Sequence, residues 1–282
     1  MQPQAEVSKE RNVQQYFLQS IATAKKSVDT TVLLMTMLAL GLFILTVVLL
    51  TDIRALAVFV GLIIFGFIKI KLQQRRVVAN GISIMATRHY NVQNLLQEIS
   101  INLQSPPIEL FVTDDLDTRR IETLGSGKRF LILLDDSLLS DMDDAELRIL
   151  LTREVGMIVF GSAPLLSFVR RFSEAFSFFG IGTFIESMFG FWSRRAIMSA
   201  DRLAVLYTRD PVAVMKALIK LDIGATISET VSVSAVLQQK KLQSGFSRWL
   251  VQLSSEQPLL TERLYAALLF ANEAQVPFRL DQ

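Results

Sequence analysis

The sequence contains no cysteine and a single histidine among its 282 residues. Without cysteine there can be no disulfide framework, no thiolate nucleophile and no cysteine-ligated metal site, so the redox compartment cannot be inferred. A catalytic zinc ion normally takes three protein ligands from His, Glu, Asp or Cys and leaves one position for water. His89 is the only histidine, and an all-carboxylate site would suit magnesium or calcium better than zinc. The ligand count therefore argues against zinc, and we expect His89 to be a surface or packing residue.

The chain also lacks an excess of charge of either sign, with Lys+Arg 29 against Asp+Glu 27. No basic stretch is interleaved with aromatic residues, so nucleic acid is not an expected partner. Hydrophobic residues make up 51% of the chain and the mean hydropathy is +0.39. Such an apolar composition predicts a membrane segment and makes the lipid bilayer a partner.

Two apolar runs provide this membrane segment. Residues 31–51 carry no charge and are long enough to span a bilayer, and residues 55–68 form a second, shorter run. We expect a transmembrane helical hairpin over 31–71, preceded by a polar segment over 1–30 that includes a short helix near the membrane. The alternative is that these runs form buried core helices.

The flanking charges predict the orientation of this hairpin. The basic residues before it are Lys9, Arg11, Lys25 and Lys26, those after it are Lys69, Lys71, Arg75 and Arg76, and the connection has only Arg54. Because cytoplasmic flanks of membrane helices are enriched in Lys and Arg, both ends of the hairpin are expected in the cytoplasm. The rest of the chain would then be a cytoplasmic domain.

Over residues 77–282 the sequence predicts one domain of the α+β class, mainly helical and with a small β-sheet. Strands are expected at 108–112 and at 129–134, the second after a turn at 125–127, and a helix is expected from about Ser140. The other expected helices cover 91–103, 199–207, 212–221 and 258–271.

Residues 160–192 form a Phe-rich insertion that holds nine of the 19 Phe residues of the chain. Two short helices that turn at 180–182 and lie in the headgroup region of a membrane would suit these aromatics and the basic residues at either end. A flap that covers the soluble core is the alternative.

The most informative stretch is Arg153-Glu154-Val155-Gly156-Met157, within the helix expected from about Ser140. It has the spacing of the H-E-x-x-H zinc-peptidase helix with both histidines replaced. Arg153 and Met157 stand at the i and i+4 positions that would share one helix face and bind a metal, and Glu154 stands where a general base would.

The order of the segments resembles the membrane-anchored zinc metallopeptidases that include HtpX and the CAAX prenyl proteases. The resemblance covers about residues 90–270. It rests on Pro107–Val112 as a first strand, on Thr123–Gly125 with Phe130–Leu134 as a turn and edge strand, on Asp144–Leu147 with Arg153–Met157, on Arg194–Arg202 as an "R-x-x-E-x-x-A-D" segment, and on Gln257–Arg263 as a closing "H-P-x-x-x-x-R" element.

This resemblance places the three metal-ligand positions at Arg153, Met157 and Ile197, all substituted, whereas Glu154 and Asp201 keep the type found in the family. Zinc in such a site activates its bound water, and a glutamate without that metal has no activated water to deprotonate. We therefore expect no zinc and no peptide hydrolysis by the mechanism of the family.

We further expect the Arg153 guanidinium to pair with Glu154 or Asp201, because a buried carboxylate without a cation is costly. Met157 and Ile197 would fill the emptied space. In the alternative arrangement, Arg153 points into solvent.

The resulting hypothesis is a catalytically inactive peptidase homologue, a pseudopeptidase, that serves as a binding, scaffold or regulatory subunit at the cytoplasmic membrane face. Its partner would be a membrane or cytoplasmic protein. An edge strand over Phe130, Leu131, Ile132, Leu133 and Leu134 could pair with an extended peptide, since strand addition requires only backbone groups. One alternative is an active membrane metalloendopeptidase with non-standard metal ligands. Another is a structural part of a membrane assembly that uses residues 160–192 as its contact surface.

Overall fold

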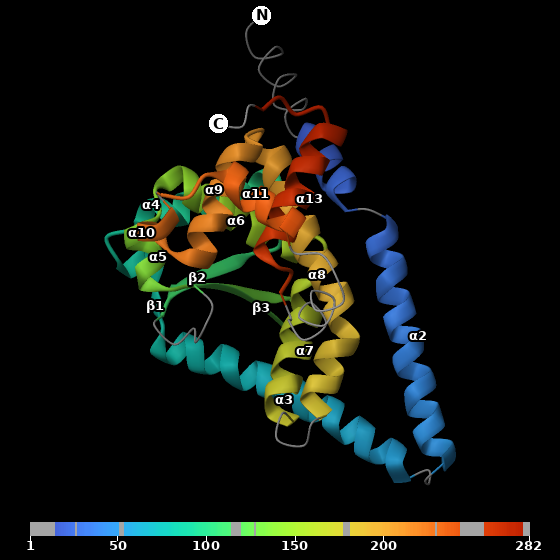
Figure 1. Cartoon of the computed structure of the whole chain (residues 1–282). Helices are drawn as coiled ribbons and strands as arrows, with labels where there is room; N and C mark the ends of the chain where they lie inside the picture. Colours follow the sequence, from blue (N-terminus) through green and yellow to red (C-terminus); the bar gives the residue numbers. More distant parts are fainter. Residues whose placement is uncertain are drawn as a thin grey trace, which may run out of the picture.

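The chain folds into helices around one small sheet, as the computed structural model shows (Figure 1). Residues 15–25, 27–50, 54–113, 120–126, 128–176, 181–228, 230–242 and 257–278 are described. Residues 15–24 are helical. The further elements are α2 (Ser27–Leu50), α3 (Arg54–Asn80), β1 (Ile82–Ser83), the 3-10 helix η1 (Ile84–Ala86), α4 (Tyr90–Asn102), β2 (Ile108–Val112), β3 (Ile121–Ser126), β4 (Arg129–Leu134), α5 (Asp136–Asp141), α6 (Asp144–Val159), α7 (Ala163–Phe176), α8 (Ile181–Thr208), α9 (Pro211–Ile223), α10 (Ala225–Ser228), α11 (Val233–Leu242) and α13 (Leu260–Glu273). The predicted α+β class is confirmed.

Helices α2 and α3 are long and apolar enough to cross a membrane, over Thr30–Leu49 and Leu56–Asn80. They diverge from their connection, and α7 and α8 extend into the space between them (Figure 1). Helix α8 packs against α2, and α7 packs against α3. The apolar helix pair that the sequence predicts is therefore present, but its two helices contact the domain as well as each other. The location of the domain on the cytoplasmic side of the membrane stays a prediction.

The sheet has the strand order β1-β2-β4-β3, with β4 parallel to β2 and antiparallel to β3. The prediction that Phe130, Leu131, Ile132, Leu133 and Leu134 form an edge strand is wrong, because β4 has a hydrogen-bonded neighbour on each side. Ile132 and Leu134 pack into the main core, whereas Leu131 and Leu133 pack on the opposite face, against Val77 of α3. A strand that is buried on both faces is apolar at every position, which accounts for this run.

Strand β3 forms one edge of the sheet, and it occupies residues that the sequence assigned to turns. Ile121 and Glu122 pair with Leu134 and Leu133, and Gly125 pairs with Phe130. The predicted turn at 125–127 is therefore partly strand, and Gly127 lies outside the described residues.

Helix α6 begins at Asp144, a few residues later than predicted. Asp143 caps it, since its side chain accepts a hydrogen bond from the Glu146 backbone N–H while the Glu146 carboxylate accepts one from the Asp143 N–H. Such a reciprocal capping box satisfies two N–H groups that a helix start leaves free. From Leu147 onward almost every side chain of α6 is buried. The helix that carries Arg153 and Glu154 is thus central to the core.

The Phe-rich insertion consists of α7 and the first part of α8. The helix expected over 199–207 is only the end of α8, which runs unbroken from Ile181, so the second of the two predicted helices is not short. Residues 177–180, between the two helices, lie outside the described part. The Phe168 ring lies 5.1 Å from that of Phe67, and Phe189 and Trp192 are buried near α2. The insertion therefore joins the domain to both apolar helices.

The contact between α3 and α7 can be tested at Gly66. A Cβ atom at Gly66 would lie 2.8 Å from the Phe168 ring, whereas one at Gly61 on the same helix would meet nothing within 4 Å. We expect Gly66→Leu to destabilise the detergent-solubilised protein by about 1–3 kcal/mol through overpacking. Gly61→Leu is the matched control and should leave the thermal unfolding temperature unchanged. Equal unfolding temperatures for the two variants would contradict this packing.

Candidate functional site

Helices α6 and α8 cross closely where the predicted site residues lie. A Cβ atom at Gly156 would stand 2.9 Å from a Leu203 methyl group, so the glycine permits this approach. The crossing brings Glu154 of α6 and Asp201 of α8 to the same guanidinium. Arg153 Nη1 donates to Glu154 Oε1 at 2.7 Å, and Arg153 Nε lies 2.8 Å from Asp201 Oδ1. The second contact is an ion pair without the angle of a hydrogen bond. The sequence predicts that Arg153 pairs with Glu154 or Asp201, and the structure shows it paired with both.

A second guanidinium completes this buried network. Arg263 of α13 binds Asp201 through two hydrogen bonds, Nε to Oδ2 at 2.9 Å and Nη2 to Oδ1 at 3.1 Å. Its third contact, from Nη1 to Asp222 Oδ1 at the end of α9, is 3.3 Å. Arg153, Glu154, Asp201 and Arg263 are all less than a tenth exposed. The network therefore ties α6, α8, α9 and α13 together inside the domain.

The charges in this network shift one another's protonation. Burial acts to raise the pKa of Asp201, but the neighbouring Arg263 and Arg153 outweigh it and hold the pKa below its ordinary value. For Asp222, burial dominates over the same two cations and raises the pKa. Asp201 is thus the ionised partner of both guanidinium groups.

A cavity of about 560 Å³ opens on this network. Arg153, Glu154, Met157 and Ile197 all line it, so the structure gathers around one space Glu154 and the three positions that the resemblance assigns to metal ligands. Met157 and Ile197 are buried, but they fill the space only in part. Charged residues of both signs, among them Arg120, Arg170 and Asp222, line the rest of the cavity.

Strand β3 borders the cavity and contributes contacts that the sequence did not reveal. Thr123 Oγ1 donates to Glu154 Oε2 at 2.6 Å, so both carboxylate oxygens of Glu154 have a partner. On the outer edge of β3, Ser167 of α7 accepts from the Gly125 N–H at 3.0 Å, and its hydroxyl, which donates to the Ala163 carbonyl at 2.8 Å, also lies 3.3 Å from the Thr123 carbonyl. Helix α7 therefore occupies part of the edge that an added peptide strand would use.

Glu122 is a further buried charge that sequence reasoning missed. It forms ion pairs with Arg170 and with Arg171 of α7, the latter at 3.0 Å. These residues are far apart in the sequence and follow no recognisable motif. Arg263 is different, because it closes one of the segments that carry the family resemblance.

The side chains at the three positions that the resemblance assigns to metal ligands do not fit zinc. A guanidinium is cationic and offers no lone pair, a thioether is a poor zinc ligand, and an alkyl side chain offers no ligand atom at all. Across the described residues no group of three or more His, Cys, Asp or Glu side chains is arranged to hold a metal. His89 is exposed and directly precedes α4.

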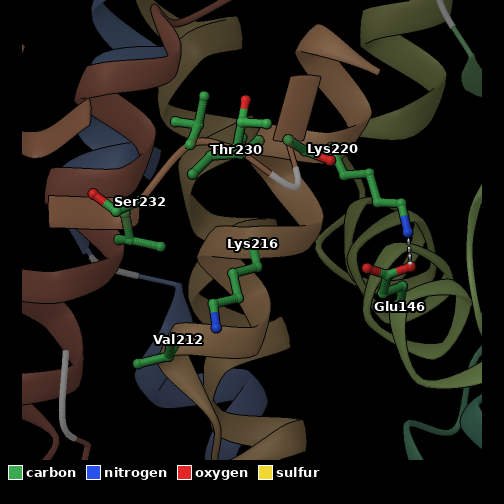
Figure 2. A pocket seen from close by; sticks show the side chains of 10 residues that line it. Glu146, Val212, Lys216, Lys220, Thr230 and Ser232 are labelled. Carbon is green, nitrogen blue, oxygen red and sulfur yellow. Dashed lines mark hydrogen bonds and ion pairs between the residues drawn. The ribbon is translucent and has the colours of Figure 1, made fainter. Parts of the chain in front are cut away.

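A second cavity, of about 440 Å³, lies between α9, the segment after α10 and the start of α6. Figure 2 shows Lys220 reaching from α9 to Glu146, with its Nζ 2.8 Å from the carboxylate. The hydroxyls of Ser228 and Thr230 both donate to backbone carbonyls of their own turn. The polar groups of this cavity are therefore engaged in local structure, and the first cavity remains the candidate site.

Comparison with known proteins supports the metallopeptidase-like class that the resemblance indicates. The chain is similar to "Plastoglobule-localized metallopeptidase 48, chloroplastic" of Arabidopsis thaliana, with 27% identity over 203 residues. The match covers 65% of this chain and 58% of the relative, so the chain spans little more than half of that protein's length. No family model matches the chain. The similarity supports a metallopeptidase-like fold.

The coupling between Arg153 and Glu154 can be measured. Removal of one member of a buried ion pair leaves an uncompensated charge, so we expect Arg153→Met to cost about 3–5 kcal/mol of unfolding free energy at neutral pH. The cost should be clearly smaller in a Glu154→Gln background, because less buried charge then remains unpaired. Chemical unfolding of the solubilised protein gives all four corners of this double-mutant cycle.

Arg148→Met is the matched control on the same helix. Arg148 pairs with Glu98 on the surface, where both side chains are about a third or more exposed. Its loss should cost about 1 kcal/mol or less. Equal costs for the two arginine variants, or no coupling between Arg153 and Glu154, would contradict the buried network.

Proposed function

We propose that this chain is a catalytically inactive relative of the membrane-anchored metallopeptidases that include HtpX and the CAAX prenyl proteases. It acts as a binding or regulatory subunit at the cytoplasmic face of a membrane. The observation that carries the proposal is the position of the Arg153 guanidinium, within 2.8 Å of both Glu154 and Asp201. A cation at that place repels a metal ion and supplies the positive charge that the carboxylates need.

The state of Glu154 supports the loss of peptidase chemistry. A general base must face the water whose proton it takes. Glu154 instead accepts from Arg153 through one oxygen and from Thr123 through the other, and it is 2% exposed. The Glu154 carboxylate therefore has the environment of a partner in a structural ion pair.

The cavity supports a binding role. Its volume of about 560 Å³ lies in the range of ligand sites, and its wall combines apolar side chains such as Leu166 and Leu221 with charges of both signs. Such a surface suits a polypeptide segment with mixed side chains. Because Ser167 occupies part of the β3 edge, we infer binding through side chains in the cavity rather than through strand addition.

Helices α2 and α3 support the membrane location. Both expose large apolar side chains along their length, among them Leu38, Leu42, Phe67 and Ile68. The name of the similar Arabidopsis protein places that protein in chloroplast plastoglobules. For the present chain, the cytoplasmic orientation rests on the flanking basic residues.

A photo-crosslinking experiment tests the binding role and the lack of hydrolysis together. A benzophenone amino acid in place of Leu221, which lines the cavity, should capture a polypeptide in native membranes. The same probe in place of Ile227, which is 56% exposed and lies outside this cavity, is the matched control and should not. The captured polypeptide should be intact, and Glu154→Gln should not change its length.

Two results would contradict the proposal. Capture that is equal at positions 221 and 227, or absent from both, would leave the cavity without a binding role. Cleavage fragments that disappear in the Glu154→Gln variant would show that the chain is an active peptidase with unconventional ligands.

A further inference from the structure

A cavity of about 720 Å³ lies where α3 passes over the sheet beside the end of α7. Its wall is formed by Lys69, Gln73 and Arg76 of α3, by Leu133 of β4, and by Arg171 and Glu174 of α7. It is separate from the site around Glu154, with which it shares no lining residue. Its volume lies within the range of small-molecule sites.

Positive charge predominates in this cavity. Of its charged side chains, three are cationic and only Glu174 is anionic. Glu174 accepts from Arg171 Nη1 at 2.7 and 2.8 Å, and Arg171 Nη2 binds Glu122 at 3.0 Å, so these carboxylates are already engaged. Lys69 and Arg76 are exposed at the cavity. An anion would therefore find more attraction than repulsion here.

Two buried polar atoms in the wall are left without a hydrogen bond. Among the described residues, neither Arg171 Nε nor Gln73 Oε1 has a partner. A buried polar group without a partner is uncommon and costs free energy. A phosphate oxygen can accept from Arg171 Nε, and a hydroxyl on the same ligand can donate to Gln73 Oε1. Both residues line the cavity, and a rotation of either side chain would present its free donor or acceptor to a phosphate with a hydroxyl-bearing substituent.

The position of the cavity along α3 identifies the source of such a phosphate. Before Lys69, α3 exposes apolar side chains, with Ile64, Phe67 and Ile68 at 53%, 53% and 49%. From Lys69 onward the helix is basic. A helix that changes from apolar to basic in this way places the change at the boundary between lipid tails and headgroups. The cavity begins at that change.

We propose that this cavity binds the headgroup of an anionic phospholipid, with Lys69, Arg76 and the Nε of Arg171 around the phosphate and Gln73 beside a headgroup hydroxyl. A lipid so held would fix the position of α3 and α7 at the membrane surface. A free phosphate compound has the same chemistry, but the apolar surface of α3 that leads to the cavity favours the lipid.

Native mass spectrometry of the full chain tests this proposal. The wild-type protein, in micelles with equal amounts of phosphatidylglycerol and phosphatidylcholine, should retain phosphatidylglycerol preferentially. Lys69→Gln/Arg76→Gln should reduce this preference by about tenfold, because each cationic contact near the lipid surface contributes substantially to anionic-lipid binding. Lys69→Gln alone should give a smaller loss in the same direction.

Lys71→Gln/Arg75→Gln is the matched control. These two residues are exposed on the same helix and carry the same charge, but they do not line the cavity. The control variant should keep the wild-type preference. Two results would overturn the proposal. An equal loss of phosphatidylglycerol preference in both double variants would show attraction to the basic helix as a whole. A wild-type protein without a preference for phosphatidylglycerol would show that no such site exists.

Inorganic phosphate and glycerol phosphate separate a lipid from a soluble anion. If either compound displaces phosphatidylglycerol at low millimolar concentration and raises the thermal unfolding temperature as much as the lipid does, the ligand is soluble and the lipid assignment is wrong. We expect neither compound to compete, because they lack the acyl chains that would contact α3.

Discussion

The Arg153 guanidinium, held between two buried carboxylates, is the interaction on which the interior of this protein depends. Glu154 and Asp201 come from two helices that cross at a glycine, and each residue is only 2% exposed. Two anions at such a place require a cation, because a charge without a partner is costly inside a protein. In a zinc peptidase the metal would provide it. Here Arg153 does, together with Arg263, which binds the other side of Asp201.

This arrangement also holds the peptidase-like architecture together through the chain's own charged side chains. The two guanidinium groups link α6, α8, α9 and α13, so the helices around the site remain fixed in position. Met157 and Ile197 line a cavity beside the network and fill it only in part. The space beside these residues is large enough for another molecule to bind.

The sequence predicted the parts of this structure that depend on local spacing. The helix of Arg153 and Glu154, the strands at 108–112 and 129–134, and the ion pair itself follow from residues that are close together or belong to a recognised segment. The order of the strands in the sheet does not follow from local spacing. The family resemblance indicates an edge strand at β4, whereas its apolar run favours an interior strand. The structure agrees with the apolar run.

Contacts between distant residues were beyond sequence reasoning. Ser167 reaches the edge of β3, and Glu122 meets Arg170 and Arg171, only because α7 turns by 90° from α6 and lies along the strand. Nothing in the residue types at these positions indicates such a partner. The full length of α8 does not follow from the sequence for a related reason, since Phe189 and Trp192 pack against other helices and make this part of α8 resemble a separate segment.

The most direct test is the zinc affinity of the wild-type chain compared with a variant in which the three ligand types are restored. In Arg153→His/Met157→His/Ile197→Glu, the guanidinium is gone and three zinc ligands face the same cavity. Calorimetric titration should show about one zinc ion bound per chain of this variant and none per wild-type chain. Tight, stoichiometric zinc binding by the wild-type chain would contradict the central claim, because a metal and the Arg153 guanidinium cannot occupy the same place.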